Sequence, residues 1–258
     1  MVSAAQVNDL RKITGAGIME CKTALVEANG DENLAVEILR KKGAAKAAKK
    51  SGRDTKEGSV FIETDKNKGV IVLLNCETDF VANNDKIQNF GQNLAKKALS
   101  TTAEAVIEEG QNEISELIGT IGENIKIVKI KKVEASIIGT YLHSNKKIGV
   151  IIGLEGGSIE LAKNIAMHAA ATNPSVLSPT DIDDTVLAKE KEIWIEQLKN
   201  EGKPENIIEN ILKGKERKFR EENALISQVY VKDSSKKIEN LLKEEGSNIT
   251  DFIRLSVN

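Results

Sequence analysis

Residues 1–53 carry apolar side chains at helical spacing, interrupted by two glycine-containing turns. Gly15 ends the first apolar pattern, because glycine readily adopts the positive φ of a helix C-terminus. A second pattern begins near Met19 and stops at the turn Asn29–Asp31, where Asp31 can cap a third helix. We therefore expect three short helices, with an exposed, Lys/Ala-rich helix end and linker from Arg40 to Arg53. Their inward-facing side chains are expected to be Val7, Leu10, Ile13, Cys21, Leu25, Leu34, Ile38 and Leu39.

Residues 54–135 change to the pattern of β-strands. The runs 59–64 and 69–74 are rich in β-branched residues and flank a polar turn at 65–68, which is typical of a hairpin. A helical pattern at 87–99 and a third strand pattern at 125–133 follow. This order predicts a small antiparallel sheet with a helix on one face.

The same hairpin pattern occurs a second time, at 139–143 and 149–154. In both copies Gly-Val-Ile opens the second strand, at Gly69 and at Gly149, and a helical pattern follows, here at 159–171. We interpret residues 54–135 and 136–258 as two related halves of an α+β core. The halves are expected to pack against each other, and residues 225–257 to close the second one.

Residues 185–222 break the repeat with two apolar stripes on either side of the turn Gly202–Pro204. Narrow stripes on otherwise charged helices predict an antiparallel hairpin that projects from the core. The stripes consist of Val186, Ile193, Ile195, Leu198, Ile207, Ile208, Ile211, Leu212 and Phe219.

Composition indicates a folded, soluble protein whose core is aliphatic. Of the 258 residues 40% are hydrophobic and only 3% aromatic, and the net charge of −2 argues against nucleic-acid binding by the chain as a whole. Cys21 and Cys76 match no zinc or CxxC spacing and are expected to be reduced core thiols. The sequence shows neither an apolar signal-peptide core nor a membrane-length run, so we expect a cytoplasmic protein.

No catalytic constellation is recognisable in the sequence. The two histidines, His143 and His168, share no metal spacing with each other or with cysteines or acids, and no phosphate-binding loop is present. His168 lies in an alanine-rich pattern and is expected to be packed in the core. We therefore expect no enzymatic activity, no metal and no cofactor.

Two segments are candidates for binding. The lysine-rich run 40–50 could contact RNA phosphates, although a solvated helix face is favoured because no aromatic residue lies among the lysines. In 75–85, Phe80 and Val81 follow a buried strand and stand among Asn and Asp residues. A phenylalanine there either enters a partner's pocket or folds back on its own helix, and its chemistry alone does not decide between them.

Specific motifs resemble the elongation factor Ts family. Thr14-Gly15-Ala16-Gly17-Ile18-Met19-Glu20-Cys21-Lys22-Thr23-Ala24-Leu25 and the following 27–31 are similar to its N-terminal signature, and Asn75-Cys76-Glu77-Thr78-Asp79-Phe80-Val81-Ala82 to its second signature. Residues 121–125 and 165–168 resemble two further family motifs. The resemblance covers essentially the whole chain in the same order.

This resemblance implies a fold and a function. The implied fold has a ubiquitin-associated-like three-helix head, a duplicated core and an inserted coiled-coil hairpin. The implied function is guanine-nucleotide exchange on elongation factor Tu, with the second signature disturbing the partner's Mg²⁺ site. Contacts with the partner are implied for Thr78, Asp79, Phe80 and Val81, for Arg11, Ile18 and Met19 of the head, and for His143 of the second half.

A rival interpretation is a ubiquitin-associated-type adaptor or an RNA-binding accessory protein. It accounts for residues 1–53 and leaves the rest of the chain unexplained. A structural scaffold, based on the helical hairpin alone, is a third option. Some family members continue beyond the last core strand into a C-terminal helix, whereas this sequence ends at Asn258, so the contacts of that helix are not carried over.

Overall fold

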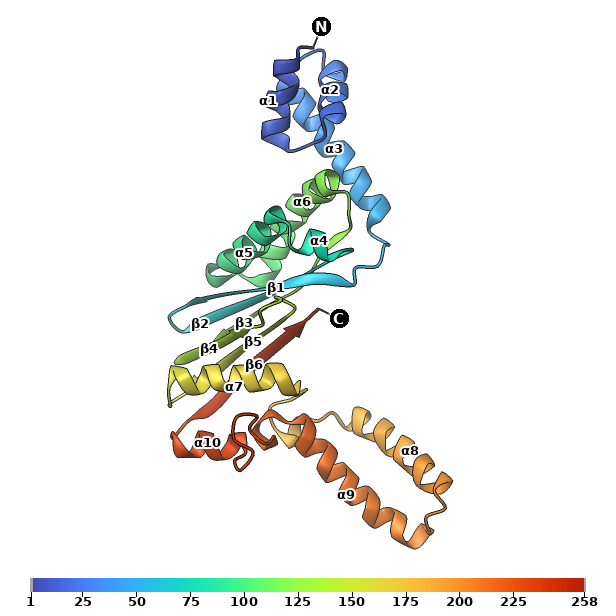
Figure 1. The fold of residues 1–258 in the computed structure, drawn as a ribbon, viewed down its shortest axis with the longest axis vertical. Helices are drawn as coiled ribbons and strands as arrows, with labels where there is room; N and C mark the ends of the chain where they lie inside the picture. Colours follow the sequence, from blue (N-terminus) through green and yellow to red (C-terminus); the bar gives the residue numbers. More distant parts are fainter. Residues whose placement is uncertain (1, 258) are drawn as a thin grey trace.

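The N-terminal head consists of three helices, as expected. The structure is a computed structural model that describes residues 2–257, apart from the side chain of Asn206. The helices are α1 (Ala4–Thr14), α2 (Ile18–Glu27) and α3 (Glu32–Lys50), and α3 runs from the head down to the core (Figure 1). Leu10, Cys21 and Leu25 are fully buried between them.

Two expectations for the head core were wrong. Ile13 is 69% exposed and Leu34 is 43% exposed. The small side chains Ala24, Ala28 and Ala35 take inward positions instead. The three helices are short and approach one another closely, so alanine fits where a branched side chain does not.

The first sheet has the antiparallel order β1-β2-β3, and helices cover one of its faces. The aliphatic core lies between this sheet and the helices and includes Val70, Val72, Ile87 and Phe90. The elements are β1 (Glu57–Asp65), β2 (Lys68–Cys76), α4 (Asp79–Ala82), α5 (Asp85–Ser100), α6 (Ala103–Ile121) and β3 (Ile125–Glu134).

Helix α6 was not predicted from the sequence. Its inward stripe contains Gly110, where a Cβ atom would come within 2.8 Å of Ile127 Cδ1, so one core position shows no apolar side chain. The termini carry clear signals: the Thr102 hydroxyl accepts from the Ala105 N–H at 3.3 Å, and Gly122 has a φ of +90°. Capping residues would have identified this helix where the broken stripe did not.

The second sheet repeats this arrangement with the order β4-β5-β6. Its core lies against α7 and α10 and includes Val150, Ile152, Ile165 and Ile238. The elements are β4 (Ile137–Leu142), β5 (Ile148–Glu155), α7 (Ile159–Thr172), α10 (Ile238–Glu244) and β6 (Asn248–Ser256).

The likeness of the two sheets extends to details of their hydrogen bonding. The pairing with the third strand shifts register between Leu73 and Leu74 in β2, and between Gly153 and Leu154 in β5. In each third strand a cation donates to backbone carbonyl oxygen atoms near the C-terminal end of a helix that follows the hairpin, α5 in the first half and α7 in the second. The Lys132 Nζ donates to Leu99 and Thr101 at 3.4 and 3.3 Å, and the Arg254 guanidinium donates to Ala170 at 3.4 Å. These cations satisfy carbonyl groups that a helix end leaves unpaired.

The sheets stack face to face between the two groups of helices (Figure 1). Their shared apolar layer includes Ile71 from one sheet and Ile151 from the other. A Cβ atom at Gly69 would lie 3.0 Å from the Ile151 side chain, and one at Gly149 would lie 3.1 Å from Ile71. The glycines that begin the two Gly-Val-Ile sequences therefore allow the sheets to approach closely.

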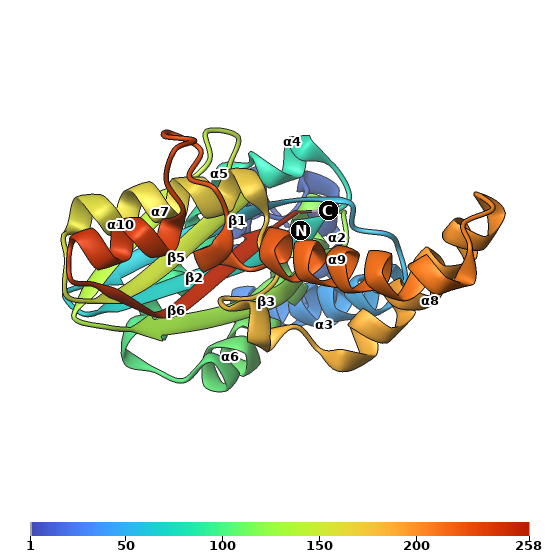
Figure 2. The same ribbon diagram turned by 90° about the horizontal axis from the view of Figure 1, so that it is seen from below.

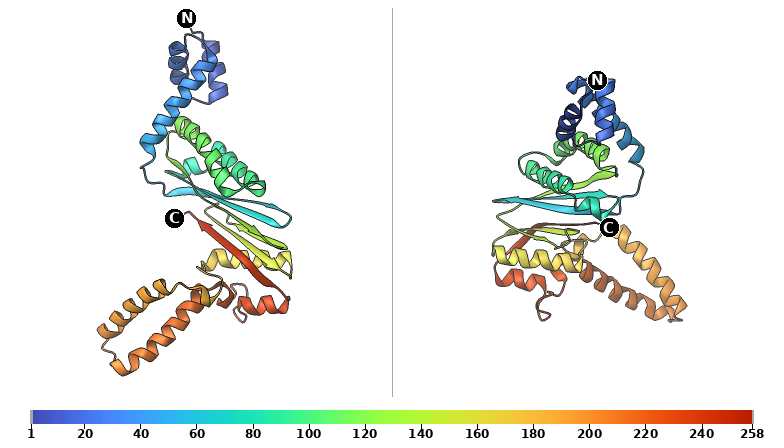
Figure 3. Two further views of the ribbon diagram at one scale, coloured as in Figure 1. Left: turned by 180° about the vertical axis from the view of Figure 1, so that it is seen from behind. Right: turned by 45° about the horizontal axis from the view of Figure 1, so that its top comes forward.

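The helical hairpin is inserted between α7 and α10 and projects from the core (Figure 1, Figure 3). Leu187 and Leu198 are buried, and Trp194 packs edge-on against Phe219 with ring centroids 5.7 Å apart. Its elements are α8 (Asp184–Asn200) and α9 (Glu205–Asn223), with the short 3-10 helices η1 (Pro179–Asp181) and η2 (Leu225–Ser227) at its base.

The expected stripe on α8 was only partly right. Leu198 is buried and Ile195 is half-buried, whereas Val186 and Ile193 are each 48% exposed. The residues that face α9 include Leu187 and Trp194, so the stripe is rotated by about one position. The large indole at Trp194 favours this rotation, because it covers more apolar surface than isoleucine.

Gly139 packs directly under α7, which leads to a stability prediction. A Cβ atom there would come 2.3 Å from the backbone carbon of Ala162. We expect Gly139→Ala to lower the free energy of unfolding by about 1–3 kcal/mol. Gly214→Ala is the matched control, because a Cβ atom at Gly214, inside α9, would meet no other part of the protein within 4 Å. Alanine should stabilise that helix by up to about 1 kcal/mol. Urea unfolding of both variants measures the two effects, and equal shifts would contradict the predicted close packing.

Candidate functional site

The candidate site is the one-turn helix α4, directly after the buried strand β2. Thr78 is its N-cap, with extended φ and ψ of −126° and 157°, and its hydroxyl accepts from the Val81 N–H at 3.4 Å. The Asn83 amide donates to the Asp79 carbonyl at 2.9 Å and helps to close the turn. Asn84 then caps α5 by accepting from Lys86 N–H at 3.0 Å. The polar residues of this segment are thus N-caps and turn formers.

Phe80 points outward from this turn and is 86% exposed. Its neighbours Val81 and Ala82 are 8% and 3% exposed and belong to the core of the first sheet. The alternative that Phe80 folds back on its own helix is therefore wrong. Asp79 is also exposed. The site thus presents an aromatic ring and a carboxylate to solvent on a turn anchored by its two buried residues.

The carboxylate of Glu123 fixes the start of α4. It accepts the Thr78 backbone N–H at 3.0 Å and the Thr78 hydroxyl at 2.8 Å, one bond on each oxygen. The adjacent Glu77 accepts the Asn124 N–H at 2.7 Å. The side-chain amide of Asn124, which is 1% exposed, donates to the carbonyl of Arg53 at 2.8 Å. The corner at 122–124 therefore links the α4 turn to the end of the linker from the head.

Cys76 supports the same turn as a neutral thiol. Burial, with smaller contributions from the carboxylates of Glu123 and Glu57, raises the pKa of Cys76 to about 12. Its Sγ lies 3.1 Å from the Thr78 carbonyl, which it can donate to. Cys21 is also free and buried. A thiol with so high a pKa is a poor nucleophile, and across residues 2–257 no group of three or more His, Cys, Asp or Glu side chains is arranged to hold a metal ion.

The proposed contact residues of the head form an exposed surface. Arg11 is exposed, and Ile18 and Met19 are 52% and 69% exposed. Ile13 lines the same pocket as Met19 and is 69% exposed, although its helical spacing predicted a core position. The signal that could have identified it is its position in the last turn of α1, where little chain remains to cover it.

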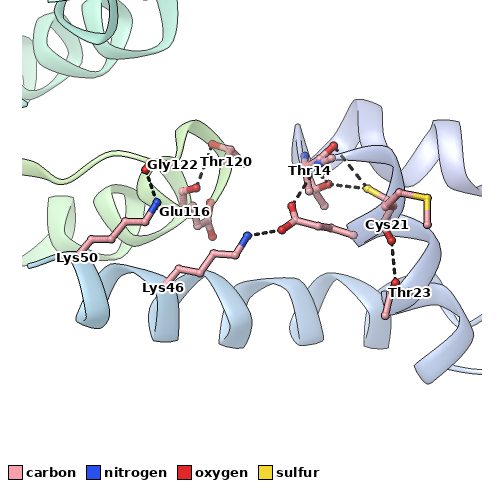
Figure 4. A network of polar contacts seen from close by, with 12 residues as sticks. Thr14, Cys21, Thr23, Lys46, Lys50, Glu116, Thr120 and Gly122 are labelled. Carbon is pink, nitrogen blue, oxygen red and sulfur yellow. Dashed lines mark hydrogen bonds and ion pairs between the residues drawn. The ribbon is translucent and has the colours of Figure 1, made fainter. Parts of the chain in front are cut away.

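The head is held to the core by α3. Lys46 reaches toward the head, where it pairs with Glu20, and Lys50 reaches toward the corner, where it donates to the Gly122 carbonyl (Figure 4). A Cβ atom at Gly119 of α6 would come 3.0 Å from Cα of Gly43, so α3 and α6 cross at two glycines. These contacts fix the orientation of the head relative to α6, the helix that precedes Glu123.

His143 lies in the β4–β5 turn and is exposed. The Tyr141 hydroxyl is 2.9 Å from its Nδ1. This turn contacts the α4 region through Gln88, which bonds Lys146 on one side and donates to the Ala82 carbonyl at 2.7 Å on the other. Figure 2 shows α4 and the β4–β5 turn along the same edge of the molecule. The turn that contains His143 therefore lies along the same edge as α4.

His168 is a fully buried core residue, as expected. Its Nε2 is 3.0 Å from Gln228 Oε1, and its Nδ1 accepts from the Val231 N–H at 3.3 Å. Burial lowers the pKa of His168, so its imidazole is neutral at pH 7. The residue joins α7 to the segment after η2 and has no place in the exposed site.

Sequence reasoning missed the role of Glu123. The residue stood in one of the motifs quoted for the resemblance, at 121–125, but its partner Thr78 lies 45 residues away. A contact of that separation depends on the pairing of β2 with β3, which brings Cys76 opposite Ile125. Once that pairing is known, an acid next to the end of β2 can be recognised as a cap for the following turn.

Comparison with known proteins gives a consistent result. A family model described as Elongation factor TS matches residues 77–258. Proteins named Elongation factor Ts from Vibrio campbellii and Stutzerimonas stutzeri are 43% and 42% identical to this chain, over 99% of it and 91% of each relative. The relative from Francisella tularensis subsp. novicida is 43% identical over 99% of this chain and 92% of its own length. The chain therefore belongs to the elongation factor Ts family.

Proposed function

We propose that this chain binds elongation factor Tu and accelerates release of its GDP by disturbing the partner's Mg²⁺ site. Membership of the elongation factor Ts family gives the chain its general role, that of a nucleotide exchange factor in translation elongation. The partner and the manner of exchange are the proposal. Of the four residues Thr78–Val81, the exposed Asp79 and Phe80 contact the partner, and Thr78 and the buried Val81 hold the turn that presents them.

The exposure of Phe80 is the observation that carries this proposal. A ring that is 86% exposed gains most of its burial energy when a partner covers it. The turn beneath it is already ordered by Glu123 and by the buried Val81. Binding therefore need not order the loop first, and the available energy can be used to move the partner's structure.

Displacement of Mg²⁺ explains exchange without contact with GDP. A bound nucleotide is held largely through its phosphates and the Mg²⁺ that neutralises them. An aromatic ring wedged between the partner's helices can shift the groups that position this ion. The phosphates then lose their counter-charge, and GDP dissociates faster.

The head and the second half supply binding area in this proposal. We infer that residues 1–53 form a ubiquitin-associated-like head, which docks on the GTPase domain through Arg11, Ile18 and Met19. Residues 54–135 and 136–258 are the two halves of a duplicated core, and His143 of the second half contacts another domain of the partner. The helical hairpin at about 185–222 has the character of a coiled coil, supported by the Trp194–Phe219 contact.

The chain itself needs no cofactor or metal for this role and is not an enzyme, because the bonds of GDP stay intact during exchange. Its place of action is the cytoplasm. Between residues 2 and 257 no helix is both long and apolar enough to cross a membrane.

The rival adaptor or RNA-binding interpretation relied on the three-helix head and on the lysine run 40–50. Several of those cations pair within the chain, including Arg40 with Glu116 and Lys42 with Glu27.

Release of a fluorescent GDP analogue from elongation factor Tu tests the function directly. We expect this protein to accelerate release in a saturable manner, without changing the nucleotide chemically. A control with heat-unfolded protein excludes effects of added buffer or chelating contaminants. An unchanged release rate at saturating protein would reject the proposed exchange activity.

A further inference from the structure

The chain has two clusters of lysines, one on α3 and one on β3, which differ in how many of their charges are paired with acids. In α3 the lysines are largely used internally: Lys41 pairs with Glu37 at 2.7 Å and Lys42 with Glu27 at 2.8 Å. In β3, by contrast, Lys126, Lys129 and Lys131 form no ion pair with any residue in the described range 2–257. All three are exposed. The cluster that is conspicuous in the sequence is thus mostly neutralised, and the less conspicuous one is free.

A β-bulge places these three lysines on one face of β3. Lys129 and Lys131 lie opposite Leu73 and Ile71, which belong to the layer between the sheets. Lys126 lies opposite Asn75, on the same face of β2 as Leu73. Without the register shift at Val128, residues 126 and 129 would point to opposite faces. The bulge therefore aligns three cations along one edge of the molecule.

Lys129 and Lys131 line an open recess between the edge strands of the two sheets, and Lys126 lies farther along the same face of β3. The recess has a volume of about 400 Å³ and is lined by β3, by β6 and by residues 174–175. Figure 2 shows β3 and β6 running close together. Lys132 and Arg254 also reach the recess, but they bond helix carbonyl groups. Asp251 is the one acid among the lining residues that the structure describes, so positive charge predominates.

We propose that this edge, the β3 lysine strip (Lys126, Lys129 and Lys131), binds the phosphate backbone of RNA. Successive same-face side chains on a strand are about 7 Å apart, which suits point contacts with a chain of phosphates. Lysine provides a flexible point charge, so the contact does not depend on base sequence. Phe252, the only aromatic residue among the described residues that line the recess, is half-buried in the core of the second sheet and is not free to stack on bases. A factor that works in translation meets RNA continually, which favours RNA over other polyanions.

Protection of the sheet edge is the competing explanation. Lysines on edge strands prevent sheets from pairing with other chains, and β3 and β6 are both edge strands. Edge protection accounts for charged residues on β3, but the charges could lie on either face of the strand. Edge protection does not explain why all three lysines lie on one face of β3, an alignment that follows from the bulge. The two explanations differ in whether the strip has affinity for RNA.

Fluorescence anisotropy with a short labelled single-stranded RNA distinguishes them, using the whole chain. The test variant is Lys126→Gln/Lys129→Gln/Lys131→Gln, and the control is Lys41→Gln/Lys42→Gln/Lys49→Gln, which removes the same charge from α3. We expect the β3 variant to bind RNA at least tenfold more weakly at low salt. The slope of log affinity against log salt should be about −2 for three contacts with single-stranded RNA, and close to zero in the β3 variant. The α3 control should bind like the wild type.

Several outcomes would overturn the proposal. Wild-type protein that fails to bind RNA at low salt would leave edge protection as the explanation. Equal losses in the β3 and α3 variants would show that only net charge matters. Stronger binding to polyglutamate than to RNA would identify an acidic protein surface as the partner. Circular dichroism of the β3 variant confirms its fold, and its GDP-release activity should be unchanged, so this result is independent of the exchange function.

Discussion

Replacing Phe80 with alanine is expected to slow stimulated GDP release from elongation factor Tu by about 10- to 100-fold. Burial of a phenylalanine side chain is worth roughly 1.5–3 kcal/mol, and each 1.36 kcal/mol in the barrier is about tenfold in rate. The ring is 86% exposed in the free chain, so its removal costs the fold little. Stopped-flow release with a fluorescent GDP analogue measures the effect, while thermal unfolding should be nearly unchanged.

A matched control is available in the second half. Ile159 begins α7, which follows the second hairpin as α4 follows the first, and it is 58% exposed. Ile159→Ala removes exposed apolar surface from a corresponding turn, and it should leave GDP release unaffected. Asp79→Ala should act in the same direction as Phe80→Ala but more weakly, because one exposed carboxylate makes few contacts. Equal deficits in the Phe80 and Ile159 variants would reject a special role for the ring.

Prior removal of the metal tests how Phe80 acts. If the ring works by dislodging Mg²⁺, chelation beforehand should shrink the difference between wild type and Phe80→Ala. Coupling is reciprocal, so the variant should also bind nucleotide-free partner more weakly, and GDP should oppose its binding less. A deficit of the same size without metal would mean that Phe80 couples to the nucleotide by another route.

Strands and turns were predictable from the sequence where a local pattern determines them. The two hairpins are specified by β-branched runs and by short polar turns, and the observed strands extend the predicted ones by only a few residues. Helix α7 shows its apolar face without interruption. By contrast, the inward stripe of α6 includes Gly110, where the side chain of Ile127 from β3 occupies the space that a larger residue would fill. The sequence around Gly110 does not show that a side chain from β3 fills this position.

The candidate site was also predictable only in part, because some of its features depend on contacts between distant segments of the chain. Phe80 stood out as a phenylalanine among turn-forming residues, but whether it points outward depends on which residues of the turn fill the core. Ile13 had core spacing yet is exposed, because the head is small and alanines complete its interior. The ion pairs of the α3 cations Arg40, Lys41 and Lys42 involve acids on α6, on α3 itself and on α2. Such contacts become visible only once the chain is folded.

Glu123→Ala is expected to impair both stability and exchange, because it removes the acceptor for two bonds at the start of α4. The N–H and hydroxyl of Thr78 both lose their partner in a partly buried place, which should destabilise the fold by about 1–3 kcal/mol. Glu123→Gln retains one acceptor oxygen and should lose less. Glu113→Ala, which removes another glutamate from the adjoining α6, should have almost no effect on either property.

The effect on exchange arises because the turn must then be ordered during binding. Ordering a single residue's backbone costs about 1–2 kcal/mol, so we expect GDP release stimulated by Glu123→Ala to be slower by about tenfold, although Phe80 is intact. Thr78→Val, which removes only the hydroxyl, should give a smaller deficit of the same kind. In a double-mutant cycle of Thr78→Val and Glu123→Ala, the two losses should be less than additive by at least about 0.5 kcal/mol, since both remove one shared bond. Full additivity would show that Glu123 acts through other contacts, and a stability loss with normal exchange would show that the carboxylate maintains the fold without positioning Phe80.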